Sequence, residues 1–561
     1  MGLSARRVRH FSLSRNRAAL PVQPGKAART AFARQASSQR PGVRSDAAPP
    51  FLPFAAKWRN TRLYLQTQEQ AVNTNACTVS GPVTGPVFYH RPGLLPCLAV
   101  CLPLLCALLW LSLPVAARGE EAFPLDFTTI RLGDATRVVL VVGGIQGDEP
   151  GGFSAATLLA TRYDILEGAV WVVPNLNFPS IIKRSRGLHG DMNRKFARLD
   201  ESDPEFPTVR RIQELIRHPR VALVLNLHDG SGYYRANYQN YLCNPARWGQ
   251  SVIIDQDGLP SGVFMGALAQ EAARVTAEVN QRLIKSLHVL HVHNTNTAAG
   301  DKEMEKSLSY YAVRQGKAAF GLEASKEFPV ELRAYYHLSM VESFLRRAGV
   351  RFKRDFSLTP QGVGEALRAN LGVSFAENRV FLPLEDVRPA INYLPLPKGS
   401  PARAVTSKPI MAVLPCQNRD RELCIHYGNR TITLIKPDWR EMDHSLESVR
   451  VTVDGREEVV SFGRVLDVAE TVRVHPQEGF RVNAIGFDSG RRDESGLLLR
   501  RKDFAPRFSV DRGGTLFRVE VYKKQSFAGL FLLRFNAKNA RLAKGRAILP
   551  DRPGPESKLG F

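Results

Sequence analysis

The chain has 561 residues, of which 44% are hydrophobic and 23% are charged, and this size and composition predict several globular domains. Its formal net charge is +24, but residues 1–91 hold 14 Lys and Arg against two acidic residues, so half of the excess lies there. Because the rest of the chain is only mildly basic, the charge does not indicate a nucleic-acid-binding protein.

The N-terminal segment 1–91 has few apolar residues in a helical or strand period, which predicts a basic and disordered extension. No methionine occurs between Met1 and Met192. We therefore interpret residues 1–86 as a wrongly assigned 5′ extension, with Val87 as a candidate start. A long basic targeting peptide is the alternative.

Residues 92–117 form an uncharged, apolar segment that follows a short polar flank, His90 and Arg91. The segment ends in Ala116 and Ala117, the small residues that a signal peptidase requires, and this pattern predicts a secretory signal and a periplasmic protein. The run is also long enough to span a bilayer, so an uncleaved signal would anchor the chain in the inner membrane.

Nearly continuous apolar runs alternate with helical patterns between residues 122 and 350. The runs predict strands buried on both faces, and they cover residues 137–144, 169–177, 221–230 and 318–325. The predicted helices between them cover residues 151–163, 205–218 and 265–287. This alternation predicts an α/β domain over residues 118–350, with a mostly parallel or mixed sheet covered by helices.

Short β-branched segments separated by turns dominate the C-terminal part of the chain. Asp454 and Gly455 form the kind of pair that favours a tight hairpin turn. We expect two small β-rich domains, one over residues 351–440 and a sandwich-like one over residues 441–545. Residues 546–561 are rich in Pro, Gly and charged residues, which predicts a disordered tail.

Three of the seven cysteines follow the predicted signal. Cys416 and Cys424 are close enough in sequence to bridge a hairpin in an oxidising compartment. This pairing would leave Cys243 free.

Polar side chains stand at the carboxyl ends of three predicted strands. Gln146 and Glu149 follow the first run. His228 closes the third run, and Glu323 closes the fourth. In open α/β sheets the ligand lies beyond these strand ends, so we expect the four side chains at one rim. An amide, a carboxylate and an imidazole can share a zinc ion and leave a fourth position for water, with Glu323 as the proton acceptor.

The sequence QGDE at residues 146–149, His228 and Glu323 resemble the zinc carboxypeptidases of the carboxypeptidase A fold. That family binds zinc through a His-x-x-Glu motif and a later strand-end His, and it uses a later Glu in catalysis. Glutamine in place of the first His resembles one branch, the bacterial D,L-carboxypeptidases that trim peptidoglycan tripeptides and set helical cell shape. The resemblance spans residues 122 to about 540, loosely in the β part.

This resemblance implies that Gln146, Glu149 and His228 bind Zn²⁺. It also implies a substrate, the muropeptide tripeptide, whose bond between D-Glu and meso-diaminopimelate is hydrolysed in the periplasm. The substrate carries several carboxylates, so a cationic pocket would complement it.

A cationic loop follows the second predicted strand, and the resemblance assigns its residues to the substrate. In the family an Asn-Arg pair holds the terminal carboxylate, and Asn193 and Arg194 match this pair. Arg186 resembles the arginine that polarises the scissile carbonyl, a task suited to the fixed geometry of a guanidinium. Lys326 is a candidate contact for a further carboxylate.

Other polar residues near these motifs have competing interpretations. Tyr310 and Tyr311 are candidates for the lid tyrosine of some family members, with core packing as the alternative. His288, His291 and His293 are spaced like metal ligands, but their alternation with valine indicates a strand beside the site. We therefore do not assign them to the metal.

Two other functions compete with the carboxypeptidase interpretation. Succinylglutamate desuccinylases and aspartoacylases share a similar glycine-rich motif, but they are usually cytoplasmic and the predicted signal argues against them. A catalytically inactive module that binds cell-wall peptide is the second alternative. It would not require the acid Glu323.

Overall fold

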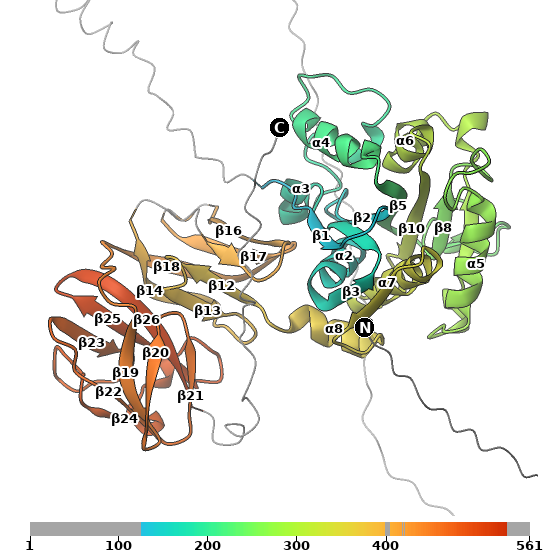
Figure 1. Cartoon of the computed structure of the whole chain (residues 1–561). Coiled ribbons are helices and arrows are strands. Elements are labelled where there is room, and N and C mark those ends of the chain that lie inside the picture. The colour runs from blue at the N-terminus through green and yellow to red at the C-terminus, as the bar shows by residue number, and fades with distance from the viewer. Residues whose placement is uncertain (1–124, 399–403, 418, 420, 536–561) are drawn as a thin grey trace, which may run out of the picture. The chain divides into compact units, whose positions relative to one another are not determined.

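The computed structural model describes residues 125–398, 404–417, 419 and 421–535 (Figure 1). The expected extension over residues 1–91, the signal over residues 92–117 and the tail over residues 546–561 lie outside this part of the chain. Within it, no helix is both long and apolar enough to cross a membrane.

A seven-stranded mixed sheet forms the centre of the α/β part, in the order β1-β4-β2-β5-β10-β8-β9. Strands β4, β2, β5 and β10 run parallel, while β1 and β8 run antiparallel to their inner neighbours. The strands are β1 (Ile130–Gly133), β2 (Val138–Val142), β4 (Ala169–Val173), β5 (Val221–Gly230), β8 (Ser251–Ile254), β9 (His291–Asn294) and β10 (Ala318–Ser325). The predicted α/β class is therefore confirmed.

The central strands are apolar because both of their faces are covered. Every residue of β2, β4 and β10 is buried, which is the pattern of parallel strands between helical layers. In the pairing of β5 with β10, Glu323 lies opposite His228. The register of these two strands therefore places two of the predicted site residues side by side.

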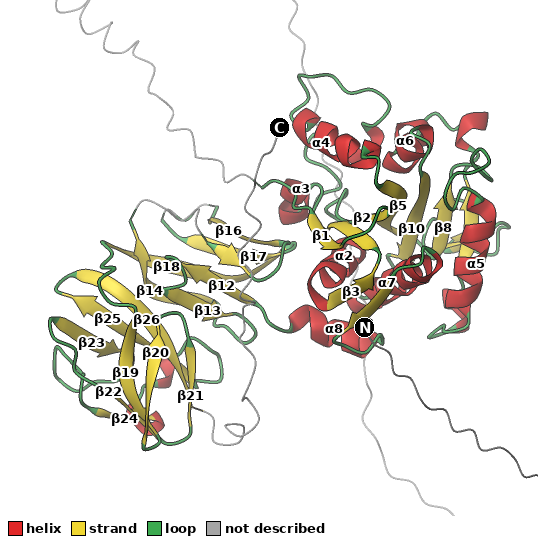
Figure 2. Ribbon diagram, viewed as in Figure 1, coloured by secondary structure: helices red, strands yellow, loops and turns green. Residues whose placement is uncertain are grey.

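Helices pack on this sheet (Figure 2). Helices α2 and α7 contact each other and both contact β5, while α6 contacts β5 and β10. The helices are α2 (Pro150–Arg162), α3 (Phe178–Lys183), α4 (Phe206–Arg217), α5 (Leu268–Asn280), α6 (Leu308–Arg314), α7 (Val330–Arg347) and α8 (Pro360–Arg368). Short 3-10 turns are η1 (Met192–Arg194), η2 (Ser286–His288), η3 (Thr297–Ala299) and η4 (Met304–Lys306).

Helix α5 ends at Asn280, so the expected helix over residues 265–287 was too long. The Asn280 side chain donates to the Leu290 carbonyl at 3.0 Å and accepts from the Leu290 amide at 2.8 Å. This pair of hydrogen bonds ties the end of the helix to the chain that returns into β9.

The C-terminal part consists of β-sheets. One sheet has the order β13-β12-β15 and another β14-β18-β17-β16. Two further sheets have the orders β20-β19-β22-β24 and β21-β26-β25-β23. The strands are β12 (Gly372–Phe375), β13 (Val380–Pro383), β14 (Ala390–Pro397), β15 (Val405–Thr406), β16 (Met411–Pro415), β17 (Leu423–Tyr427), β18 (Arg430–Arg440), β19 (Ser448–Val453), β20 (Arg456–Ser461), β21 (Val465–Val468), β22 (Thr471–Val474), β23 (Phe480–Ala484), β24 (Leu498–Arg500), β25 (Leu516–Lys523) and β26 (Ser526–Phe535).

Smaller pairings complete the fold. Two strand pairs lie beside the central sheet, β3 (Tyr163–Glu167) with β11 (Arg351–Arg354) and β6 (Tyr233–Tyr234) with β7 (Cys243–Asn244). Two late 3-10 turns are η6 (Arg501–Asp503) and η7 (Pro506–Phe508).

Two local predictions in the β part are confirmed. Asp454 and Gly455 join β19 to β20 with φ values of 48° and 81°, the left-handed conformation that a tight hairpin turn requires. Cys416 and Cys424 form a disulfide that links the end of β16 to β17, and Cys243 is free and buried.

The β25–β26 hairpin contributes to two hydrophobic cores. Phe517, Val519, Phe531 and Leu533 pack in a core with β19 and β22. Tyr522, Phe527, Leu530 and Leu532 pack in a core with β12 and β14. Because successive side chains of a strand point to opposite faces, one hairpin can serve both cores.

Candidate active site

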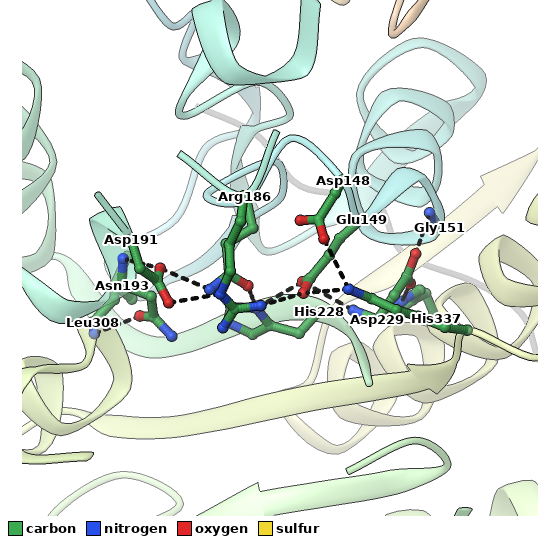
Figure 3. Close-up of polar contacts among 12 residues, drawn as sticks. Asp148, Glu149, Gly151, Arg186, Asp191, Asn193, His228, Asp229, Leu308 and His337 are labelled. Atoms are coloured by element: carbon green, nitrogen blue, oxygen red, sulfur yellow. Dashed lines mark hydrogen bonds and ion pairs between the residues drawn. The ribbon is translucent and has the colours of Figure 1, made fainter. Parts of the chain in front are cut away.

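Three predicted metal ligands converge at the carboxyl ends of β2 and β5. Two of them, Glu149 and His228, are labelled in Figure 3. Gln146 Oε1 and Glu149 Oε2 each lie 3.1 Å from His228 Nδ1. All three side chains are buried. An amide oxygen, a carboxylate oxygen and an imidazole nitrogen from two distant segments thus face one point.

The turn that carries Gln146 and Glu149 packs directly on α3. A Cβ atom at Gly147 would lie 2.1 Å from the carbonyl carbon and oxygen of Ser180, so only glycine fits there. Pro150 then occupies the first helical position of α2, where its missing N–H costs nothing. The sequence Q-G-D-E-P therefore both supplies two of the predicted ligands and starts the helix.

Glu323 lies beside this cluster with a free carboxylate oxygen. Its side chain is buried, and Oε2 has no hydrogen-bond partner within the described residues. Burial, together with the charges of Glu149 and Asp229, raises the pKa of Glu323 well above the ordinary value. The group therefore has a strong affinity for a proton.

All eight predicted site residues line one cavity of about 240 Å³. The eight are Gln146, Glu149, Arg186, Asn193, Arg194, His228, Glu323 and Lys326. Trp248, Ile253, Met304 and Ser309 complete much of the remaining wall. The structure thus brings together residues that lie up to 180 positions apart in the sequence.

The chain matches two family models and a group of solved structures. Residues 106–368 match "Carboxypeptidase controlling helical cell shape catalytic", and residues 442–536 match "C-terminal domain of metallo-carboxypeptidase". Product-bound and tripeptide-bound crystal structures of the cell shape determinant Csd4 from Helicobacter pylori are each 39% identical, with TM-scores of 0.68. Each comparison covers 73% of this chain and 100% of the Csd4 chain.

The chain belongs to this carboxypeptidase family. A third structure, the mDAP-bound form of Helicobacter pylori Csd4, described as a D,L-carboxypeptidase, is also 39% identical and has a TM-score of 0.68. That comparison covers 72% of this chain and 100% of the Csd4 chain. A comparison with curated proteins finds no match.

The donor atoms of this carboxypeptidase fit a divalent metal ion. A neutral amide oxygen and a carboxylate oxygen each lie 3.1 Å from the imidazole nitrogen of His228, and all three side chains are buried. Such donors suit zinc. Glu323 lines the same cavity. The residues present therefore fit the metal that a metallocarboxypeptidase requires.

Asp191 is a site residue that the sequence reasoning missed. Its Oδ1 accepts a hydrogen bond of 2.8 Å from Gln146 Nε2, and its Oδ2 accepts one of 2.9 Å from Arg186 Nε. Burial opposes ionisation of Asp191, but the Gln146 hydrogen bond and the Arg186 charge outweigh it and lower the pKa. The only signal in the sequence was an acidic residue two positions before Asn193.

The cations of the cavity already contact acidic groups. Arg186 Nη1 lies 3.4 Å from Glu149 Oε1. Lys326 Nζ lies 3.1 Å from Asp148 Oδ2 and 3.4 Å from Glu149 Oε1. Burial lowers the pKa of Lys326, but the charges of Glu149 and Asp148 outweigh it and raise the value. Both side chains therefore remain positively charged beside the metal ligands.

Asn193, which precedes Arg194, lies beside Asp191 (Figure 3), and its backbone N–H donates to Asp191 Oδ1 at 2.9 Å. The Asn193 amide oxygen accepts from the Leu308 backbone N–H at 3.0 Å, which leaves its NH₂ group to donate to a ligand. Arg194 Nη1 donates to the Asn193 carbonyl at 3.1 Å, and its Nε lies 3.6 Å from Glu303. The pair is positioned on η1 by backbone contacts as well as by side chains.

The remaining aromatic and histidine candidates lie around the cavity. From helix α6, Ser309 lines the cavity. The ring of Tyr311 packs against Phe196 instead, with 6.0 Å between the ring centroids. His293 stacks on Tyr234 at 4.0 Å in edge strand β9. Within the described part of the chain, no group of three or more His, Cys, Asp or Glu side chains is arranged to hold a metal.

Proposed function

We propose that this chain is a periplasmic zinc D,L-carboxypeptidase that hydrolyses the bond between D-Glu and meso-diaminopimelate in peptidoglycan stem tripeptides and so influences cell shape. One observation carries the proposal: the predicted ligands, cations and Glu323 line a single cavity. The likeness to Csd4, whose structures include tripeptide-bound and mDAP-bound forms, supports the substrate class.

Gln146, Glu149 and His228 are the proposed zinc ligands. A zinc ion held by three protein ligands lowers the pKa of its bound water to about 7 and polarises a carbonyl. The neutral Gln146 amide donates less charge than an imidazole. We therefore expect weaker zinc binding than with two histidine ligands.

The proposed substrate contacts follow from the charges that line the cavity. Asn193 and Arg194 would bind the terminal carboxylate, because a guanidinium and an amide NH₂ both donate to oxygen. Arg186 would donate to the scissile carbonyl oxygen as it gains negative charge. Lys326 would contact a further carboxylate of the stem peptide.

Glu323 is the proposed general base and acid. Glu323 lines the cavity and lies opposite His228 in the pairing of β10 with β5, so its carboxylate can accept the proton of the attacking water. The same carboxyl group would then donate that proton to the leaving amine of diaminopimelate.

The compartment and the domain limits are parts of the same proposal. The Cys416–Cys424 disulfide supports an oxidising compartment.

We propose residues 118–350 as the catalytic domain and residues 351–440 and 441–545 as β-rich domains. The family match over residues 442–536 supports the last boundary.

Incubation of the purified chain with tripeptide muropeptides and Zn²⁺ tests the function. Release of free diaminopimelate is expected, and Glu323→Gln should lower kcat by about 10²–10⁴-fold while zinc remains bound. Hydrolysis of N-acyl amino acids without tripeptide cleavage would favour a desuccinylase-like enzyme. Tripeptide binding without turnover would favour the inactive binding module.

A further inference from the structure

A buried carboxylate lies directly behind the proposed zinc ligands. Asp229 follows His228 in β5, and its side chain has no exposed surface. It accepts hydrogen bonds from the Gly151 backbone N–H at 2.8 Å and from His337 Nε2 at 3.0 Å (Figure 3). It accepts a third from Arg333 Nη1 at 3.1 Å. These donors come from α2 and α7, so one carboxylate joins two helices to the ligand strand.

The contact with Gly151 fixes the segment that carries Glu149. Gly151 lies in the first turn of α2, and a Cβ atom there would come within 2.4 Å of Asp229 Oδ1. The Asp229 backbone N–H also donates to Glu149 Oε2 at 3.0 Å. Side chain and backbone of Asp229 therefore both set the separation of Glu149 from His228.

Arg333 extends this connection to the segment that follows Glu323. Besides its contact with Asp229, Nη2 donates to the Lys326 carbonyl at 2.6 Å and Nε donates to the Phe328 carbonyl at 2.7 Å. Lys326 and Phe328 lie just beyond β10, the strand of Glu323. One planar guanidinium thus binds the ends of two neighbouring strands in a fixed geometry.

We propose that Arg333 is a positioning residue that, through Asp229, holds the zinc ligands and Glu323 in their working arrangement. His337 completes the same cluster. Its ring is completely buried, and Nδ1 has no partner within the described residues, so its hydrogen bond to Asp229 comes from Nε2. This inference rests on the zinc site proposed above.

A matched control lies on the same helix. Glu342 of α7 is also a buried carboxylate, and it pairs with Arg354 at 2.8 Å and with Arg346 at 3.3 Å. It does not line the catalytic cavity. Loss of the Glu342 pairs should therefore affect stability without affecting the zinc site.

The test is the affinity of the full, metal-stripped chain for Zn²⁺, measured by competition with a chromophoric chelator. Arg333→Met should weaken zinc binding by about 10-fold or more, as expected when a group behind the ligands is removed. Arg333→Lys should restore part of that loss, because the ammonium keeps the charge but cannot serve all three acceptors. Glu342→Gln should lower the melting temperature and leave zinc affinity unchanged.

Steady-state kinetics on the tripeptide supply a second readout. Arg333→Met should lower kcat by a larger factor than it raises KM. Asn193 and Arg194, which would bind the terminal carboxylate, are not connected to Arg333, and Arg333 contacts the proposed substrate residue Lys326 only at its backbone carbonyl. Asp229→Asn serves as the second variant if Arg333→Met does not fold, and it should also weaken zinc binding.

Wild-type zinc affinity in both Arg333→Met and Asp229→Asn would overturn the inference, as would an equal loss of zinc binding in Glu342→Gln. A wild-type chain that binds no Zn²⁺ would overturn it together with the zinc site. A wild-type chain that binds Zn²⁺ without cleaving tripeptide would refute only the proposed substrate, and the zinc titrations would still decide the role of Arg333.

Discussion

Gln146 has two chemically different ends, and Asp191 decides which of them faces His228. The Asp191 carboxylate accepts from Nε2, so the amide oxygen points to the proposed metal. A glutamate at this position would place a second carboxylate 2.8 Å from Asp191, and the two like charges would repel. The site therefore needs a side chain that donates on one side and accepts on the other.

Removal of the Asp191 carboxylate should weaken the metal site. In Asp191→Ala the Gln146 amide can rotate, and zinc affinity should fall about 10–100-fold in a chelator competition assay. Asp191→Asn keeps an acceptor oxygen for Gln146 but turns an NH₂ group toward Arg186. In this variant kcat should therefore fall by a larger factor than the zinc affinity. Asp200→Ala is the control, because Asp200 is exposed and its side chain accepts hydrogen bonds from Ser202. An equal loss of zinc affinity in Asp200→Ala would contradict the role of Asp191.

His293 should make stability depend on pH. Burial lowers its pKa to about 4 from an ordinary value of 6.5. Between these values the unfolded chain binds a proton at His293 that the folded chain does not, so the free energy of unfolding should fall as the pH falls. The free energy of unfolding should change by at most about 1.4 kcal/mol per pH unit through this group. Because the ring is partly exposed, we expect a smaller change than this maximum.

Denaturant unfolding of wild type and His293→Phe between pH 7 and pH 4 measures this effect. Phenylalanine can keep the stacking on Tyr234 but cannot bind a proton, so the variant should lose less stability on acidification. Parallel pH curves for the two proteins would show that His293 does not titrate differently in the folded chain.

The elements that carry the site were predictable where a local pattern determines them. The buried strands β2, β4, β5 and β10 have continuous apolar runs, which predicted them as strands. The predicted site residues lie at or beyond the carboxyl ends of these strands, at the edge of the sheet where the cavity is found. The antiparallel placement of β8 beside β10 depends on pairing between distant segments, which no local period encodes. The roles of Asp191 and Asp229 were missed for the same reason, because their partners Gln146 and Gly151 lie 45 and 78 residues away.

The turn between β2 and α2 should tolerate no side chain at Gly147. Gly147→Ala would push the turn away from α3, because the new Cβ would meet the Ser180 backbone at 2.1 Å. We expect weaker zinc binding and a melting temperature lowered by several degrees, measured by chelator competition and thermal unfolding. Gly258→Ala is the control, since its Cβ would have only the Gly266 carbonyl at 3.3 Å. Similar losses in both variants would argue against a special role for this turn.

At the scale of the whole molecule, the β25–β26 hairpin connects two hydrophobic cores. Neighbouring residues of β26 face different cores: Phe531 packs with β19 and β22, and Leu532 packs with β12 and β14. The β-sheets of the C-terminal part should therefore unfold together.

Calorimetry of two neighbouring variants tests this coupling. Phe531→Ala should cost about 3–5 kcal/mol and Leu532→Ala about 2–5 kcal/mol, and both should shift the same transition. Two separate transitions, each sensitive to only one of the variants, would show that the cores are independent.

The shared hairpin also constrains the order in which this chain can be built. Residues 516–535 follow the other strands of both cores in the sequence, yet both cores need them. A ribosome that stops before residue 516 would leave two open apolar surfaces at once, which is the kind of product that proteases remove or that aggregates. Synthesis must therefore reach the β25–β26 hairpin before either hydrophobic core can be completed.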